Sequence, residues 1–218
     1  MWFEPFWSFL EQGVFPIPSQ PEGNKPLFNL YKDTNPQVDL PQAAAMRRVN
    51  LYAFLSSLPK RPPVLLLGEA PGWRGHRFSG VPFTSEVQLS RGMLPFQGLI
   101  SSQSSTPHAE ASATIFWQAL RPHHPHFFVW SSLPFHPYQP GQPLSNRTPS
   151  RQELQTFSPL VGELVRLLTP ELVVAVGRVA QQTLKWLDIP AVAIRHPSHG
   201  GADEFKRGTA EAFAHSAF

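Results

Sequence analysis

The sequence predicts an α/β protein, a three-layer α/β/α sandwich with a four-stranded and mostly parallel sheet between its helices. Two observations predict this class. Four short apolar runs have the length of buried strands, and glycine or polar residues follow each run. Helix-forming stretches lie between the runs, and strands that alternate with helices usually pair in parallel. A length of 218 residues, 41% of them hydrophobic, is enough for one sizeable core.

The first two strands are predicted within residues 42–133. Residues 42–58 are rich in helix formers and carry apolar residues at helical spacing, so a helix is expected there. The run "VLLLG" at 64–68 is typical of a fully buried strand. A second helix is expected over 111–120, and the run "HFFVWSSL" at 126–133 predicts the second strand.

A third helix is expected to begin after Ser150. Ser150 and Glu153 have the spacing of a capping box, in which each residue bonds the backbone N–H of the other. Proline lacks an N–H and clashes with the preceding turn, so Pro159 is expected to kink this helix or divide it in two. The run "ELVVAVG" at 171–177 then predicts the third strand.

The remaining elements complete the alternation. Residues 178–187 predict a helix, and the run "AVAIRHPS" at 191–198 predicts the fourth strand. A final helix is expected over 202–218, interrupted near Gly208. In open parallel sheets ligands bind beyond the carboxyl ends of the strands. The loops that leave those ends, at 68–72, 131–137 and 196–201, are therefore expected to converge on one crevice.

Residues 1–41 differ from the rest of the chain. The first fifteen are apolar but include Glu4 and Pro5 and have no basic leading segment, so they predict neither a signal peptide nor a membrane span. Residues 16–41 have many prolines and no clear period. We expect residues 1–41 to be an extended, Pro-rich arm packed on the domain, and residues 42–218 to form a single domain.

Composition narrows the functional classes. The absence of cysteine excludes disulfides, zinc–thiolate sites and Cys-ligated iron–sulfur clusters, and it fits a reducing cytoplasm. The cluster of histidines at 123–126 lies in a Pro-broken turn and predicts a solvated loop rather than a metal site. A net charge of +3 permits an anionic partner without requiring one. We expect a cytoplasmic monomer (nucleoid-associated if bacterial) with no metal, no cofactor and no membrane contact.

Six short motifs in the predicted domain resemble those of the uracil-DNA glycosylase superfamily, most closely the branch near the family-four enzymes. They are "GEAPG" at 68–72, "GVPFTSE" at 80–86, "SATIFW" at 112–117, "LPFHP" at 133–137, "PLSNRTPS" at 143–150 and "HPSHGG" at 196–201. Family-four enzymes also carry four cysteines that ligate an iron–sulfur cluster, and this chain has none. The resemblance implies a monofunctional glycosylase that flips a deaminated base out of DNA and hydrolyses its N-glycosidic bond without a cofactor.

The resemblance also implies roles for single residues. Glu69 matches the acid that orients the attacking water and stabilises the sugar cation; taken alone, it would be a helix N-cap or a loop acid bonded to backbone N–H groups. His196 matches the histidine that donates a hydrogen bond to the base oxygen. Phe83 matches the aromatic residue that stacks on the flipped base. Ala70 is expected to present a backbone amide to the base.

Residues of the last motif and one early glycine are expected to lie against the DNA backbone or in the gap left by the flipped base. These are Gly72, Ser198, His199, Gly200 and Gly201.

The second strand ends in a departure from the family. The family has an asparagine where this chain has Ser131, or Ser132 if the register differs by one. An asparagine amide both donates and accepts, whereas serine is too short for that bidentate contact, which discriminates between bases by about 1–3 kcal/mol. We therefore expect weaker uracil selectivity, or a changed base: xanthine, hypoxanthine or a base in a mismatch.

Two alternatives stay open at this point. The chain is either an active glycosylase or a protein that binds deaminated or abasic DNA without cutting it. An unrelated doubly wound domain that handles a small nucleotide is disfavoured because the chain has no Gly-rich phosphate-binding fingerprint.

Overall fold

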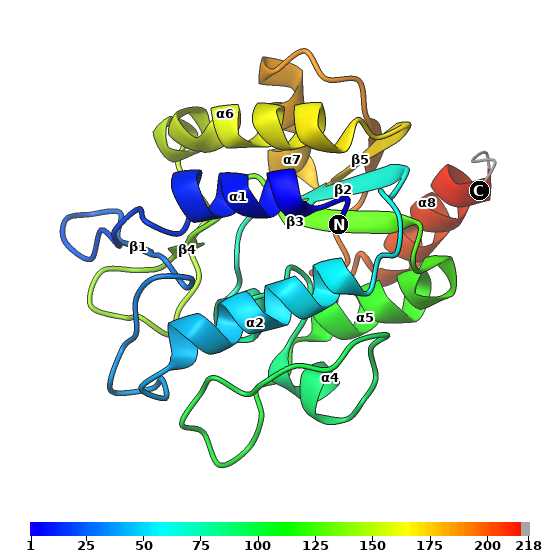
Figure 1. Cartoon of the computed structure of the whole chain (residues 1–218). Coiled ribbons are helices and arrows are strands. Elements are labelled where there is room, and N and C mark those ends of the chain that lie inside the picture. Colours follow the sequence, from blue (N-terminus) through cyan, green and yellow to red (C-terminus); the bar gives the residue numbers. More distant parts are fainter. Residues whose placement is uncertain (215–218) are drawn as a thin grey trace.

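The computed structural model describes residues 1–214 and has the predicted α/β architecture (Figure 1). Its main sheet has the strand order β3-β2-β5-β6, and every neighbouring pair is parallel. These strands are β2 (Val64–Gly68), β3 (Phe127–Ser131), β5 (Leu172–Val176) and β6 (Val192–Ile194). Figure 1 shows α1, α6 and α7 on one side of the sheet and α2 and α5 on the other.

The helices are α1 (Glu4–Gly13), α2 (Ala43–Ser56), α3 (His76–Ser79), α4 (Glu86–Ser90), α5 (Ala111–Leu120), the 3₁₀ helix η1 (Arg121–His123), α6 (Arg151–Leu168), α7 (Arg178–Trp186) and α8 (Ala202–Ala214). None of them is both long enough and apolar enough to cross a membrane, within residues 1–214.

The centre of the sheet is fully buried, because helices cover both of its faces. Every residue of β2 and of β3 is buried, as the unbroken apolar runs of these strands predict. Their register pairs Val64 with Phe127 and Gly68 with Ser131, so both strands end at the same level. The loops that follow them therefore leave the sheet side by side.

The helix predicted after Ser150 forms with its capping box, but Pro159 does not divide it. Of the two outcomes expected at Pro159, the division of the helix is wrong, because α6 is one helix from Arg151 to Leu168. Pro159 leaves the carbonyl of Gln155 without its helical donor. The Ser158 hydroxyl donates to that carbonyl at 3.0 Å and so replaces the missing N–H.

The predicted interruption of the last helix near Gly208 was also wrong. α8 runs through Gly208 without a break, and the last four residues of the predicted range, 215–218, lie outside the described residues. A Cβ at Gly208 would lie 3.0 Å from Cγ2 of Ile194. Glycine at this position lets α8 approach β6 closely. It lowers the helix propensity of α8, but it does not end the helix.

Part of the N-terminal segment is helical rather than extended. Residues 4–13 form α1, with Pro5 in the first turn, where a missing N–H costs nothing. Phe6 and Leu10 are buried one turn apart, and the Phe6 ring packs edge-on against Phe128 and Trp130 of β3. The prediction of an extended arm fails here because these apolar residues recur at helical spacing and cover the sheet.

The rest of the segment is fixed to the domain by backbone pairing and charge. Strand β1 (Leu27–Phe28) pairs antiparallel with β4 (His136–Pro137). The buried carboxylate of Asp39 accepts hydrogen bonds from the guanidinium groups of Arg47 in α2 and Arg77 in α3. The segment thus holds α3, which directly follows the loop after β2.

Candidate active site

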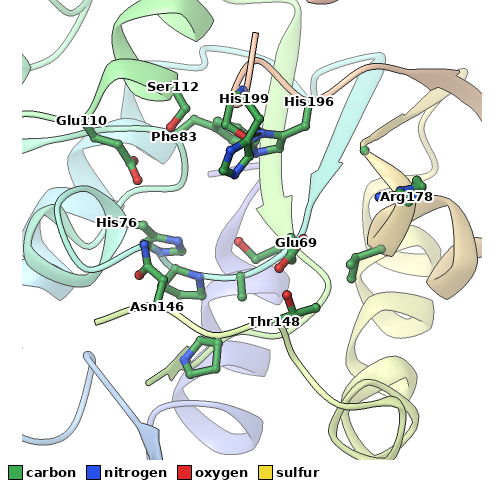
Figure 2. Close-up of a pocket in the computed structure, with 18 of the residues that line it drawn as sticks. Glu69, His76, Phe83, Glu110, Ser112, Asn146, Thr148, Arg178, His196 and His199 are labelled. Carbon is green, nitrogen blue, oxygen red and sulfur yellow. Dashed lines mark hydrogen bonds between the residues drawn. The ribbon is translucent and has the colours of Figure 1, made fainter. Parts of the chain in front are cut away.

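A cavity of about 740 Å³ opens at the carboxyl edge of the main sheet. Residues at or just after the ends of all four parallel strands line it, in agreement with the position expected for a ligand in such a sheet. Figure 2 shows Glu69, His76, Glu110 and His196 around this space. The residues that line it are Glu69, Ala70, Pro71, Gly72, His76, Phe83, Glu110, Ser112, Ser131, Pro137, Asn146, Arg147, Thr148, Gly177, Arg178, Val179, Arg195, His196, Ser198 and His199.

The cavity brings together most of the residues that the sequence singled out. Glu69, Ala70, Gly72, Phe83, Ser131, His196, Ser198 and His199 all line it. Gly200 and Gly201 are not among the lining residues and follow them in the loop before α8. A Cβ at Gly201 would lie 2.2 Å from the His196 carbonyl oxygen, so Gly201 permits the loop to fold back on itself.

Glu69 directly follows β2 and is half-buried at the cavity wall. Within residues 1–214 its carboxylate has no hydrogen-bond or ion-pair partner, and the nearest helix begins only at His76 with Gly75 as its N-cap. Glu69 is therefore neither a helix cap nor a loop acid held by backbone N–H groups. Burial raises the pKa of its carboxyl, and the charge of His199 partly offsets this effect.

The backbone on both sides of Glu69 is fixed by residues that follow β3. The Ser132 hydroxyl and the Leu133 amide donate to the carbonyls of Gly68 and Glu69, at 2.8 and 3.0 Å. Nδ1 of the buried His136 lies 2.8 Å from the Pro71 carbonyl and donates to it. Burial lowers the pKa of His136 to about 4, so this imidazole is neutral. Sequence reasoning gave His136 no role, although it lies within the motif "LPFHP".

The same contacts decide which serine faces the cavity. Ser132 is fully buried and its hydroxyl is used on the Gly68 carbonyl, whereas Ser131 lines the cavity at the end of β3. Of these two serines, Ser131 is therefore the one that a ligand in the cavity can contact.

His196 follows β6 and carries its proton on the nitrogen that is free to donate. Its Nδ1 accepts from the Ser198 backbone N–H at 3.1 Å and from the Ser198 hydroxyl at 2.7 Å. Burial, followed by the charges of Arg195 and His199, lowers the pKa of His196 to about 4. A neutral imidazole that accepts at Nδ1 is protonated at Nε2. His196 is thus a neutral hydrogen-bond donor near neutral pH.

Phe83 presents an aromatic ring to the same cavity. Its backbone has a positive φ of 49°, unusual for a residue other than glycine. The ring stacks on Phe116 of α5, with centroids 4.6 Å apart, and lies 5.4 Å from the His196 ring. A Cβ at Gly68 would lie 2.6 Å from Cε2 of this ring, so only glycine leaves room for it.

Sequence reasoning missed several polar residues of the cavity. Asn146, which lies in the motif "PLSNRTPS" but was given no role of its own, accepts a hydrogen bond from the Trp73 backbone N–H at 2.9 Å. Arg178 begins α7 beside the end of β5 and brings a positive charge to the wall. Neither residue stands out by its type, because asparagine and arginine are common on any protein surface. Among the described residues no group of three or more His, Asp or Glu side chains is placed to hold a metal ion.

Glu110 is the most unusual of the missed residues. It precedes α5, and its carboxyl lies where side chains of Gly72 and Gly75 would otherwise be, 2.5 and 2.0 Å from their would-be Cβ positions. Burial raises the pKa of Glu110 to about 7, against a smaller opposing effect of the Ser112 hydroxyl. The only signal in sequence was an acid placed just before a helix.

Replacement of Glu110 by glutamine is expected to stabilise the protein more in mild alkali than in acid. The unfolded carboxyl ionises near pH 4.5 and the folded one only near pH 7, so wild-type stability falls as the pH rises between these values and stays lower above them. Glutamine does not titrate. The change in Tm for Glu110→Gln should therefore be more positive at about pH 8 than at about pH 4.5. Equal changes at the two pH values would contradict the raised pKa.

The fold and the site together define an α/β protein with a polar cavity at the carboxyl edge of a parallel sheet. The family model described as "Uracil DNA glycosylase superfamily" matches residues 55–215, and the chain belongs to this superfamily. It is therefore a member of a family of DNA glycosylases, which act on DNA. The predicted resemblance is confirmed, and the matched range includes every residue assigned to the cavity above.

A solved structure shares the fold over nearly the whole chain. The crystal structure of wild-type SMUG2 from Pedobacter heparinus superimposes with a TM-score of 0.68 at 14% sequence identity, over 98% of this chain and 97% of that chain. The shared fold thus includes the N-terminal segment, which the family model leaves out. No curated protein matches the chain.

Proposed function

We propose that this protein is a monofunctional DNA glycosylase that takes a deaminated base into the cavity and hydrolyses its N-glycosidic bond. One observation carries the proposal. Among the described residues, the carboxylate of Glu69 has no bonding partner, and the neutral imidazole of His196 has a free Nε2–H; both side chains line one cavity at the carboxyl edge of the sheet. A displaced nucleotide needs both: negative charge near the sugar and a donor near the base.

The two residues act on opposite ends of the bond that breaks. As the bond between C1′ and the base nitrogen lengthens, the sugar gains positive charge and the base leaves with the electron pair. Glu69 stabilises the sugar cation and orients the water whose oxygen bonds to C1′. The Nε2–H of His196 donates to the base oxygen that gains negative charge. The water loses one proton as its oxygen bonds to C1′, and the departing base anion takes up one proton, so the products are the neutral free base and an abasic sugar.

The other residues of the cavity hold the substrate in place. The Phe83 ring stacks on the flipped base, and the Ala70 amide donates to it. The loop with Ser198, His199, Gly200 and Gly201 lies against the DNA strand, where hydroxyl and backbone N–H groups bind phosphate. Gly72 lets the backbone after Glu69 approach the substrate.

A second candidate function is binding to deaminated or abasic DNA without cleavage. Ser131 favours it, because a single hydroxyl replaces the amide that reads uracil in the family. An oligonucleotide panel separates the two candidates. Labelled strands with one uracil, xanthine, hypoxanthine or normal base, single-stranded and paired, are incubated with the protein and treated with hot alkali. Cleavage at one lesion establishes the glycosylase, whereas tight binding without cleavage at any lesion establishes the binding protein.

Replacement of Gly68 by alanine tests the position of the Phe83 ring. The new methyl group would lie 2.6 Å from that ring and must displace it. We expect affinity for DNA with an uncleavable deaminated nucleotide to fall roughly tenfold, within the range of about 1–3 kcal/mol for one base–aromatic stack. Gly162→Ala in α6 is the control, since its Cβ would meet only Leu187, at 3.9 Å. Unchanged affinity of Gly68→Ala, measured by fluorescence anisotropy, would contradict the stacking role.

A further inference from the structure

The reaction described above leaves the Glu110 carboxyl without a task, although it lines the cavity. Figure 2 shows this carboxyl pointing into the cavity, with Phe83, Ser112 and His76 around it. The loop after β2 leaves space for the Glu110 carboxyl, because any side chain at Gly72 or Gly75 would collide with the carboxyl oxygens. A surface acid needs no such accommodation.

The surroundings of Glu110 favour the neutral acid. No lysine or arginine pairs with it in the part of the chain that the structure describes, and the Ser112 hydroxyl is its one bonding neighbour. Burial outweighs this hydroxyl and brings the pKa of Glu110 to about 7. The charged or titratable side chains that share the cavity wall are Glu69, His76, Arg147, Arg178, Arg195, His196 and His199. None of these side chains is a cause of the raised pKa of Glu110, so burial of the carboxyl is what keeps it protonated.

A neutral carboxyl has the chemistry that Ser131 lacks. It offers one O–H donor and one carbonyl acceptor on the same planar group, as an amide does. Uracil, hypoxanthine and xanthine each present a carbonyl beside a ring N–H. A planar donor–acceptor group can bond both at once, whereas one serine hydroxyl cannot. An ionised carboxylate loses the donor and repels the base oxygen.

We propose that Glu110 reads the flipped base, its neutral carboxyl donating to a base carbonyl oxygen and accepting from the adjacent base N–H. This inference rests on the proposed function in one respect, that a displaced base enters this cavity. It assigns Glu110 to the recognition of the base and not to cleavage of the bond. It also explains how the cavity selects a base although Ser131 replaces the amide.

The test compares the binding of two DNA strands by three proteins. One strand carries an uncleavable 2′-fluoroarabino analogue of deoxyuridine, and the other carries a tetrahydrofuran abasic site at the same position. The ratio of their affinities isolates the contribution of the base. Wild type, Glu110→Gln and Glu110→Ala are measured by fluorescence anisotropy from about pH 6 to about pH 8.5, with Glu163→Gln, an exposed acid paired with Arg166, as a control.

Under the proposal the wild-type ratio falls at least about fivefold with a midpoint near pH 7, because the carboxyl ionises. Glutamine keeps both the donor and the acceptor, so Glu110→Gln should hold its ratio across the range. Glu110→Ala should have a low ratio at every pH, and all proteins should bind the abasic strand alike. Circular dichroism verifies that each variant is folded.

Three outcomes would overturn the inference. These are a full ratio in Glu110→Ala, the same fall with pH in Glu110→Gln as in wild type, and a wild-type ratio near one at about pH 6. Base release from ordinary uracil strands is measured separately. A wild-type protein that shows the expected ratio but releases no base would refute the glycosylase and leave the role of Glu110 intact.

Discussion

Replacement of Glu69 by glutamine is expected to slow base release by roughly 10²–10⁴-fold and to leave affinity for uncleavable lesion DNA nearly unchanged. The amide keeps the size of the carboxylate but removes the charge that stabilises the sugar cation. Because no residue within 1–214 holds the Glu69 carboxylate, the substitution leaves no cation or backbone donor of that range unpaired. Single-turnover release from a labelled strand measures the first effect, and anisotropy measures the second.

The pH dependence of the wild-type rate provides an independent check on Glu69. Burial raises its pKa, so the carboxylate is lost as the pH falls through a value above 4.5. The rate should fall with it. Glu163→Gln, which changes an exposed acid on α6, should keep both the rate and its acid limb. A Glu69→Gln protein that releases base at the wild-type rate would remove Glu69 from the mechanism.

Replacement of His196 by alanine is expected to slow base release by roughly 10²–10³-fold, the loss that follows removal of one preorganised donor to a developing anion. The pKa of His196 is about 4, so the donor is the neutral imidazole and the wild-type rate should have no histidine limb near pH 6.5. A limb at that pH that vanishes in His196→Ala would mean that a charged imidazole acts instead.

Ser198→Ala is expected to have a smaller effect on base release than His196→Ala. It removes the hydroxyl at 2.7 Å from Nδ1 but keeps the backbone N–H at 3.1 Å, so the tautomer is retained with weaker support. Its rate should lie between those of wild type and His196→Ala. Equal losses in the two variants would indicate that the serine, and not the imidazole, is what the reaction needs.

The sequence predicted those elements of the fold that depend on a single local factor, such as an apolar run or a helix cap. The segments "VLLL" and "FFVW" are apolar without alternation, which is typical of a strand covered on both faces. Ser150 and Glu153 predicted a helix start because the capping box is a local interaction. The failures at Pro159 and Gly208 came from contacts outside the local rule: a hydroxyl that replaces an N–H, and a strand that lies close to a helix.

Apart from Ser131, the residues of the candidate site that the sequence predicted all lie within one of the six motifs. Glu69 and His196 stand at strand ends within such motifs, and the structure places both in one cavity. Glu110 and His136 act through distant partners, the loop of Gly72 and Gly75 and the carbonyl of Pro71. No local pattern reveals such contacts, because they depend on how segments far apart in the chain meet.

The pairing of β1 with β4 has a consequence for how this chain matures. Phe28 pairs with His136, so β1 must wait during synthesis until residue 136 has been made. Until then the apolar side chains of α1, including Phe6 and Leu10, have no sheet to cover and remain open to misassociation. Contacts of such long range slow folding, because the entropy of closing the loop is lost before the pairing stabilises it. The segment with α1 and β1 is thus synthesised well before the strands on which its native contacts depend.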